Sequence, residues 1–293
     1  MRLRRVRIDK ARVAQHILAY FLCFVFLLPA IWLLLASIKD YYQIFKFPPS
    51  IIPNPFVWQN YTAIFRETNN IHFVRYCLNT IFLCTFGILA ALTTNTLVAY
   101  GFARFKFPGR EVIFIILLAT MMIPGQLLWI PRYMLYKNFG WIGTYLPLLV
   151  PSFIGGNAVF IFLLRQFMNG ITQDFDDSAE VDGCGSFRTL IYVLAPMLRP
   201  GLIFITISEF VGRWNDFLEP MIFLHKEVTY PISLALWGMY ARINNVFLLH
   251  NQGEDPTGMF MALCVMTLLP PLVVYIFFQR YFVEGIRMGA LKG

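Results

Sequence analysis

Six apolar stretches, each about long enough to cross a lipid bilayer, constrain this chain more than any other feature of its sequence. A helix needs about 20 mostly apolar residues to span the hydrocarbon layer, where lipid offers no partner to an open backbone. Spanning helices are therefore expected, with soft edges, at residues 16–38, 78–103, 111–131, 145–165, 201–224 and 258–279. The chain is predicted to be an all-α integral membrane protein with six transmembrane helices.

The composition agrees with a membrane domain. Hydrophobic residues make up 58% of the chain and charged residues only 14%, against about 25% charged in an average soluble domain. The net charge of +8 comes from short Lys and Arg clusters between the apolar stretches, which favours membrane orientation over nucleic-acid binding. The five cysteines are scattered without a CxxC pair, so neither a disulfide framework nor a metal site is expected.

The basic residues also predict which way the chain crosses the membrane. Residues 1–15 form a basic tail, and the apolar stretch that follows is too long for a cleaved signal peptide. The connections after the second and fourth stretches, and the end of the chain, are also rich in Lys and Arg. The intervening connections have fewer of them. Both termini are therefore predicted to be cytoplasmic.

The connection at about residues 166–200 is the most distinctive segment on the predicted cytoplasmic side. Within nine positions it holds five acidic residues: Asp174, Asp176, Asp177, Glu180 and Asp182. Apolar residues interrupt this run, which favours a short amphipathic helix against the membrane face over an ordinary solvated helix. Gly183 and Gly185 are expected to end that helix, and Pro196 and Pro200 to close the connection.

The segment from Asp177 to Gly183, with Ile191 and Pro196 after it, resembles the EAA loop of ABC importer permeases. The usual pattern is E-A-A-x-x-D-G, and this chain has Asp177 in place of Glu and Ser178 in place of the first Ala. Further segments resemble the maltose-importer MalG type in the same order: FKFPGR at 105–110, MMIP at 121–124, LRQF at 164–167, WNDF at 214–217 and the tail at 279–293. The resemblance runs from about residue 15 to the last residue.

This resemblance implies that residues 16–293 form a MetI-like permease domain, with a cytoplasmic coupling helix between helices four and five. It implies coupling to an ATPase through Asp177, Ser178, Ala179, Asp182 and Gly183. The implied partners are a second homologous permease, two ABC ATPase subunits that bind ATP and Mg, and an extracytoplasmic binding protein that delivers a sugar. The chain itself would be a non-enzymatic, multi-pass protein of the bacterial cytoplasmic (inner) membrane, with no cofactor or metal of its own. No GxxxxGK[ST] nucleotide motif occurs in it.

Charged residues inside the fifth stretch are the main candidates for contact with a transported solute. Glu209, Arg213 and Asp216 share one helix face by their spacing. Two interpretations stay open: an ion cluster that fixes helix packing, and a polar lining of the translocation path. The full set of candidates for that path is Glu209, Arg213, Trp214, Asn215, Asp216, Asn79 and Asn95. Because a guanidinium binds carboxylates well, an acidic oligosaccharide of the alginate or pectin kind is a substrate to test.

Three other functions have to be weighed against sugar import. An ABC permease for a non-sugar solute, such as a peptide, phosphate or an amino acid, fits the EAA loop, but the WNDF and C-terminal segments argue against it. Glycerol-phosphate stays open as an alternative substrate. A membrane enzyme would need a nucleophile–base pair or a metal motif, and none is visible, since the four histidines are isolated. A passive channel would give the acidic cytoplasmic loop no purpose. ATP-dependent uptake in vesicles that contain the partner subunits separates these functions.

Overall fold

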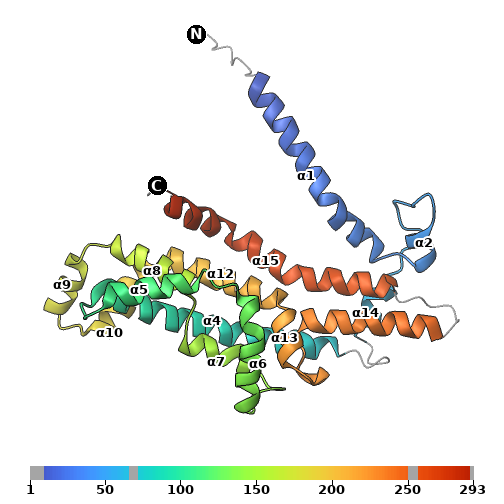
Figure 1. Ribbon diagram of the computed structural model, residues 1–293. Coiled ribbons are helices and arrows are strands. Elements are labelled where there is room, and N and C mark those ends of the chain that lie inside the picture. Colours follow the sequence, from blue (N-terminus) through green and yellow to red (C-terminus); the bar gives the residue numbers. More distant parts are fainter. Residues whose placement is uncertain (1–9, 66–71, 250–256, 291–293) are drawn as a thin grey trace, which may run out of the picture. The chain divides into compact units, whose positions relative to one another are not determined.

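The computed structural model describes residues 10–65, 72–249 and 257–290, and its regular structure within those ranges is helical (Figure 1). The predicted all-α class is confirmed. The chain divides into two units, residues 1–71 with 238–268 and residues 72–237 with 269–293. Among the described residues before position 72, the helices are α1 (Lys10–Ala36), α2 (Tyr41–Phe45) and α3 (Gln59–Ile64).

The second unit contains most of the helices. In its first half are α4 (Phe73–Arg104), α5 (Arg110–Thr120), the 3-10 helix η2 (Gly125–Leu128), α6 (Trp129–Asn138), α7 (Leu146–Ile154) and α8 (Ala158–Asn169). Then follow α9 (Asp174–Val181), α10 (Ser186–Arg188), the π-helix η3 (Thr189–Leu194), α11 (Ala195–Met197), α12 (Arg199–Asn215), α13 (Leu218–Phe223) and the 3-10 helix η4 (Glu227–Thr229). Two further helices, α14 (Ile232–Leu249) and α15 (Thr257–Ala290), carry residues of both units.

Four helical segments in the described ranges are long and apolar enough to cross a membrane. They are Val13–Ala36, Phe73–Arg104, Leu146–Asn169 and Thr257–Gln279. These correspond to the first, second, fourth and sixth predicted stretches. α1 already begins at Lys10, so the expected boundary between a tail of residues 1–15 and the membrane domain falls inside a helix. Residues 1–9 of that tail lie outside the described ranges.

The third predicted stretch contains a sharp bend, and a second sharp bend lies just before the fifth predicted stretch. Arg110–Thr120 and Gly125–Asn138 meet at 93°, and Ser186–Met197 and Arg199–Asn215 meet at 83°. Each bent pair has the apolar length of one span, which gives up to six spans in the described part of the chain. Pro124 stands at the first bend and has no N–H group to donate, so a helical hydrogen bond is lost there.

The predicted fifth helix also has different ends, and a further helix follows it. α12 stops at Asn215 because Asp216 has an extended backbone, and α13 is a separate short helix. The region after residue 224, expected to be an outer connection, contains α14, which begins with the apolar segment Ile232–Ala241. Leu146–Asn169, by contrast, contains the irregularity expected there, since α7 ends before Gly155 and α8 begins after Asn157.

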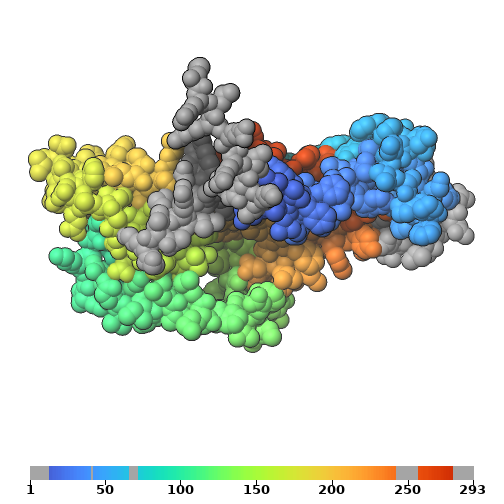
Figure 2. Space-filling model, turned by 90° about the horizontal axis from the view of Figure 1, so that it is seen from above, coloured from blue at the N-terminus to red at the C-terminus, as the bar shows by residue number. Residues whose placement is uncertain are grey.

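α4 is the central helix of the second unit. It packs against α7, α8 and α12, and small residues on its faces, Ala91 and Ala99 among them, let those helices approach closely. A second apolar cluster joins Tyr136, Leu148 and Phe223 from α6, α7 and α13. In both views α9 lies at one end of this unit (Figures 1 and 2). Polar residues of α7 and α12 line a cavity in the same unit. The two apolar clusters hold these helices in place around it.

The first unit is organised around a buried lysine. The Nζ of Lys39 donates a hydrogen bond to the carbonyl of Ser50 and lies 4.5 Å from the centre of the Trp32 ring. Burial lowers the pKa of Lys39. Asn60 holds the same turn through its Nδ2, which donates to the carbonyls of Ser37 and Lys39 at 3.0 and 2.9 Å. These contacts give the segment after α1 a defined conformation.

Candidate functional site

A polar cavity of about 540 Å³ lies within the second unit. Helices α6, α7, α12 and α13 contribute to its wall, together with the break between α7 and α8. The lining residues are Arg132, Pro147, Leu148, Pro151, Ser152, Gly156, Asn157, Ser208, Glu209, Gly212, Arg213, Asp216 and Glu219. Polar groups in a membrane domain are costly unless they pair or face water, so such a lining suits the passage of a hydrophilic solute.

Arg213 is held in the cavity wall by three of its own nitrogen atoms. Its Nε pairs with Glu209 Oε2 at 2.8 Å, one helical turn away on α12. Its Nη1 donates to the carbonyl of Leu148 at 3.1 Å, and its Nη2 donates to the hydroxyl of Ser152 at 2.8 Å. Gly87 on α4 makes room for this arrangement, because a Cβ atom there would lie 1.9 Å from Arg213 Nε. The guanidinium is therefore part of the wall, with fixed partners.

A second ion pair crosses the same cavity. Arg132 Nη1 lies 2.6 Å from Glu219 Oε1, and the guanidinium also lies over the rings of Tyr136 and Phe223. Asp216 has a backbone partner instead, since its Oδ1 accepts a hydrogen bond from the N–H of Glu219 at 3.3 Å. Three carboxylates and two guanidinium groups thus line the cavity. Arg132 pairs with Glu219 and Arg213 pairs with Glu209, so Asp216 is the carboxylate in the lining without a guanidinium partner. The lining therefore has one formal negative charge in excess.

Asn95 supports the break in the fourth span from the neighbouring α4. Only 1% of Asn95 is exposed. Its Oδ1 accepts a hydrogen bond from the N–H of Asn157 at 2.6 Å, and its Nδ2 donates to the carbonyl of Ala91 at 2.6 Å. Gly156 has a positive φ of 62°, and a Cβ atom there would lie 2.8 Å from Asn95 Oδ1. Glycine is therefore required where the chain passes close to Asn95.

Replacing Asn95 with leucine is expected to lower the free energy of unfolding by about 1–3 kcal/mol, because the N–H of Asn157 loses its buried acceptor. Thr93→Val is the matched control on the same helix, since the Thr93 hydroxyl only donates to carbonyls of its own helix. Unfolding of both variants in bicelles, titrated with SDS, measures the difference. Equal stability of Asn95→Leu and wild type would show that the break between α7 and α8 does not depend on the hydrogen bond from Asn157 to Asn95.

The structure separates the predicted path residues into two groups. Glu209, Arg213 and Asp216 line one cavity, and Asn95 supports its wall. The other three lie elsewhere: Trp214 is 5% exposed and stacks on Phe210, Asn215 donates to the carbonyl of Val211, and Asn79 donates to the carbonyls of Val228 and Tyr230. The cavity also includes Arg132 and Glu219, which were not among the candidates. Glu219 could have been found from the sequence, because it is a fourth charged residue within the apolar fifth stretch.

The acidic segment forms the helix α9, in agreement with the amphipathic helix expected there. Gly183 has a positive φ of 80°. The N–H of Cys184 donates to the carbonyl of Ala179, and the N–H of Gly183 donates to that of Glu180, at 2.8 and 2.9 Å. These two bonds form a Schellman motif, which ends a helix through a left-handed residue. Gly183 therefore sets the direction in which the chain leaves α9.

Four of the five predicted coupling residues are on the surface of this helix and turn. Asp177, Ser178, Asp182 and Gly183 are exposed, whereas Ala179 is buried and packs inward. In the described part of the chain, no hydrogen bond or ion pair involves the carboxylates of Asp177 and Asp182. Three apolar side chains near them are exposed by 46%, 88% and 62%: Phe175, Val181 and Phe187. Acidic and apolar groups together form a surface suited to a protein partner.

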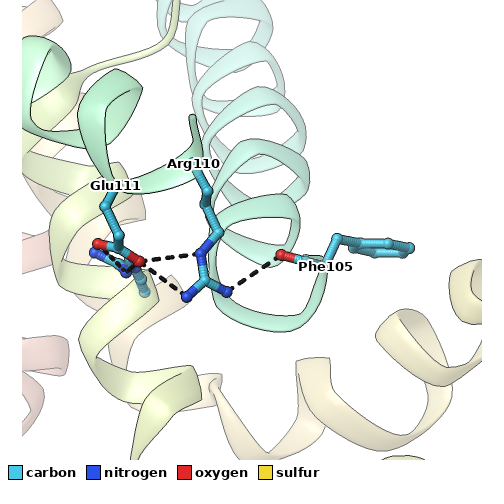
Figure 3. A network of polar contacts seen from close by, with 4 residues as sticks. Phe105, Arg110 and Glu111 are labelled. Atoms are coloured by element: carbon cyan, nitrogen blue, oxygen red, sulfur yellow. Dashed lines mark hydrogen bonds and ion pairs between the residues drawn. The ribbon is translucent and has the colours of Figure 1, made fainter. Parts of the chain in front are cut away.

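A polar network connects α5 with α8 and with the turn between α4 and α5 (Figure 3). Glu111 accepts from Arg110 Nε and from Arg165 Nη2, both at 3.0 Å, and Arg110 also donates to the carbonyl of Phe105. Arg165 lies 3.9 Å from the centre of the Phe114 ring. In the described residues, no group of three or more His, Cys, Asp or Glu side chains is arranged to hold a metal ion.

The family of the chain follows from comparison with known sequences. Residues 84–288 match the family described as "Binding-protein-dependent transport system inner membrane component". The chain belongs to this family. It is therefore a permease component of a transport system, located in the inner membrane, and is not itself an enzyme. The helical fold with broken spans is the MetI-like permease fold.

The relatives of this permease match it over nearly its whole length. The arabinooligosaccharides transport system permease AraQ of Bacillus subtilis is 28% identical over 96% of both chains. The trehalose/maltose transport system permease MalG of Thermococcus litoralis is 27% identical over 96% of this chain and 97% of its own. A solved bacterial ABC transporter involved in import of the acidic polysaccharide alginate has a TM-score of 0.82 and 23% identity, and the match covers 96% and 99% of the chains. That structural likeness supports the fold alone.

Proposed function

We propose that this permease forms half of the translocation path of an ATP-driven importer for oligosaccharides. The proposal depends on the polar cavity of the second unit, which could pass a hydrophilic solute. The chain belongs to a family of transport permeases, and two of the similar permeases are named for the transport of sugars. A second, homologous permease supplies the other half of the path. Two ABC ATPase subunits bind ATP and Mg, and an extracytoplasmic binding protein delivers the sugar.

The same proposal gives α9 the role of the contact with an ATPase subunit. Its exposed side combines the carboxylates of Asp177 and Asp182 with the apolar side chains of Val181 and Phe187. Carboxylates at the rim of a contact pair with Arg or Lys, while buried apolar groups provide most of the affinity. This role requires α9 and both termini to lie on the cytoplasmic side, which the distribution of Lys and Arg supports.

The charge of the cavity favours a neutral oligosaccharide. The expectation of an acidic substrate depended on Arg213, which already uses three of its five N–H groups on Glu209, Leu148 and Ser152 and whose charge is paired with Glu209. Carboxylates outnumber guanidinium groups in the lining, so an anionic sugar would meet net repulsion on this side of the path. Hydroxyl groups of a neutral sugar, by contrast, are good donors to carboxylates such as Asp216.

Uptake into proteoliposomes tests both parts of this proposal. The complex, reconstituted with its ATPases, second permease and binding protein, receives either labelled neutral oligosaccharides (arabinotriose and maltotriose) or a labelled uronate trimer. We expect ATP-dependent accumulation of a neutral probe, about 10-fold or more faster than that of the uronate. Asp216→Asn removes the excess negative charge of the lining and is expected to bring the uptake rate of the uronate closer to that of the neutral sugars.

The outcomes separate the two claims. If no saccharide accumulates with ATP although the complex hydrolyses ATP, sugar import is rejected, and glycerol-phosphate and a peptide are the next probes. If the uronate enters as fast as the neutral sugars, import stands and selection by charge is rejected. Thr62→Val, at an exposed hydroxyl of α3 outside the cavity, serves as the control that leaves both rates unchanged.

A further inference from the structure

Arg104, the last residue of α4, connects that helix to α9. Its Nε lies 2.9 Å from Asp176 Oδ2, and the two side chains are only 9% and 20% exposed. Its Nη2 donates to the carbonyl of Ile171 at 3.0 Å, in the segment just before α9. Arg104 Nε and Asp176 Oδ2 are buried and make no hydrogen bond within the described residues, so their ion pair is the polar interaction that satisfies both atoms. One side chain thus fixes α9 and its approach.

The other contacts of α4 reach the cavity. Gly87 lies against the guanidinium of Arg213, and Asn95 accepts the N–H of Asn157, so α4 contacts two lining residues through separate turns of one helix. α4 is a single helix of 32 residues that also packs against α7, α8 and α12. A helix of this kind moves as one body, so a displacement at Arg104 changes the surroundings of Gly87 and Asn95.

The chain connections on both sides of α9 are less suited to transmit movement. Four residues, from Gly170 to Gln173, separate it from α8. On the other side, Gly183 turns the chain, and a bend of 83° separates the segment Ser186–Met197 from α12. The Arg104 side chain, by contrast, contacts α9 directly from the end of one unbroken helix.

We propose that Arg104 is a positioning residue that ties α9 to α4, so that movement of α9 reaches the cavity through α4. This inference rests on the proposed contact of α9 with an ATPase. When nucleotide binding moves the ATPase, α9 and α4 shift together, and the positions of Arg213 and Asn157 at the cavity change with them. Loss of the Arg104–Asp176 pair lets α9 move without α4, and ATP is then hydrolysed with little transport.

Spin labels on α9 and α4 test this connection without any sugar. In a chain whose five native cysteines are replaced, Glu180→Cys and Leu89→Cys introduce labels at exposed positions of the two helices. Their distance distribution in the reconstituted complex is measured without nucleotide and with ATP plus vanadate. With Arg104 present we expect the same distribution in both states. With Arg104→Gln or Asp176→Asn we expect it to differ between the states.

The second readout is the amount of sugar imported per ATP hydrolysed in the same liposomes. Arg104→Gln and Asp176→Asn are each expected to lower this ratio about 5- to 10-fold, and the double variant no further. Arg104→Lys keeps the positive charge, so its ratio of sugar imported to ATP hydrolysed is expected to lie between those of Arg104→Gln and wild type. A general loss of stability would not produce such a partial recovery. The control is Arg165→Gln, which breaks a 3.0 Å pair with Glu111 but does not contact α9.

The possible results decide between the claims. If Arg104→Gln does not assemble, Asp176→Asn, on the other side of the same pair, gives the same test. An unchanged ratio together with an unchanged α4–α9 distance in Asp176→Asn would overturn the proposal. If the unmodified complex does not retain ATPase subunits, the proposed function fails before this inference is reached, so the two failures are distinguishable.

Discussion

Arg213→Met is expected to lower the free energy of unfolding of the permease by about 3 kcal/mol and to abolish transport, because Glu209 is left as an unpaired carboxylate in the membrane domain. The two side chains are only 17% and 16% exposed, so water replaces little of the lost interaction. The variant also releases the carbonyl of Leu148 and the hydroxyl of Ser152. SDS titration of the purified chain in bicelles measures the stability, and uptake measures the transport.

A double-mutant cycle gives this prediction its control. Glu209→Gln alone is expected to cost less, since Arg213 keeps two of its three partners, and Glu209→Gln with Arg213→Met is expected to be more stable than Arg213→Met alone. Such a result means that the penalty comes from the unpaired carboxylate. Additive losses in the double variant would show instead that the two residues act separately.

The charged face of the fifth span was predictable from sequence because its contacts are local. Glu209 and Arg213 are four residues apart, so helical periodicity alone brings them together. Arg132 pairs with Glu219 across 87 residues of sequence, and no periodic pattern reports such a contact. Arg132 also follows the bend after α5, and hydropathy assigned it to an outer connection.

Hydropathy located the apolar segments but not their bends. A sliding average is the same for a straight helix and for two helices at 93°, so the break near Pro124 was missed even though the proline is visible in the sequence. In the same way, the six apolar stretches leave the region of α14 in an outer connection, and no helix is predicted there. The positions of Trp214 and Asn215, outside the lining of this cavity, were not predictable for another reason. Their directions depend on how α12 is rotated against α4, which spacing within one helix does not determine.

The α9 turn shows the opposite case. Its end is encoded locally, by Gly183 at a position that requires a positive φ and by two hydrogen bonds to carbonyls within five residues. The sequence therefore predicted both the helix and its end. The connection from Arg104 to Asp176 spans 72 positions and was not predictable, because each residue alone resembles an ordinary surface charge.

Gly183→Val is expected to uncouple transport from ATP hydrolysis, or to release the ATPase subunits, while membrane insertion stays intact. A β-branched residue at a φ of 80° is strained by about 1–3 kcal/mol, enough to redirect the turn but too little to unfold the membrane domain. A Cβ atom at Gly183 would have no neighbour within 4 Å, so the strain comes from the backbone and not from a clash. Asp177→Ala is expected to weaken the complex less, as an exposed charge pair contributes about 0–1 kcal/mol.

Gly185→Val provides a matched comparison in the same turn. Gly185 is also exposed and without neighbours within 4 Å of a Cβ, but its φ is −76° with an extended ψ of 160°, which valine adopts readily. Any difference between the two valine variants therefore reports the left-handed conformation at Gly183. If both valine variants lose uptake and ATPase stimulation to the same extent, the loss comes from the added side chain and not from the backbone conformation.

Entry of the energy of ATP through α9 is tested by sugar-stimulated ATP hydrolysis and uptake in liposomes that contain the complete complex. Gly185→Val is expected to retain both activities, while Gly183→Val is expected to lose uptake together with the stimulation of hydrolysis by the sugar-loaded binding protein. Full stimulation and full uptake by Gly183→Val would mean that the energy of ATP does not enter through α9, and the proposed mechanism would be wrong.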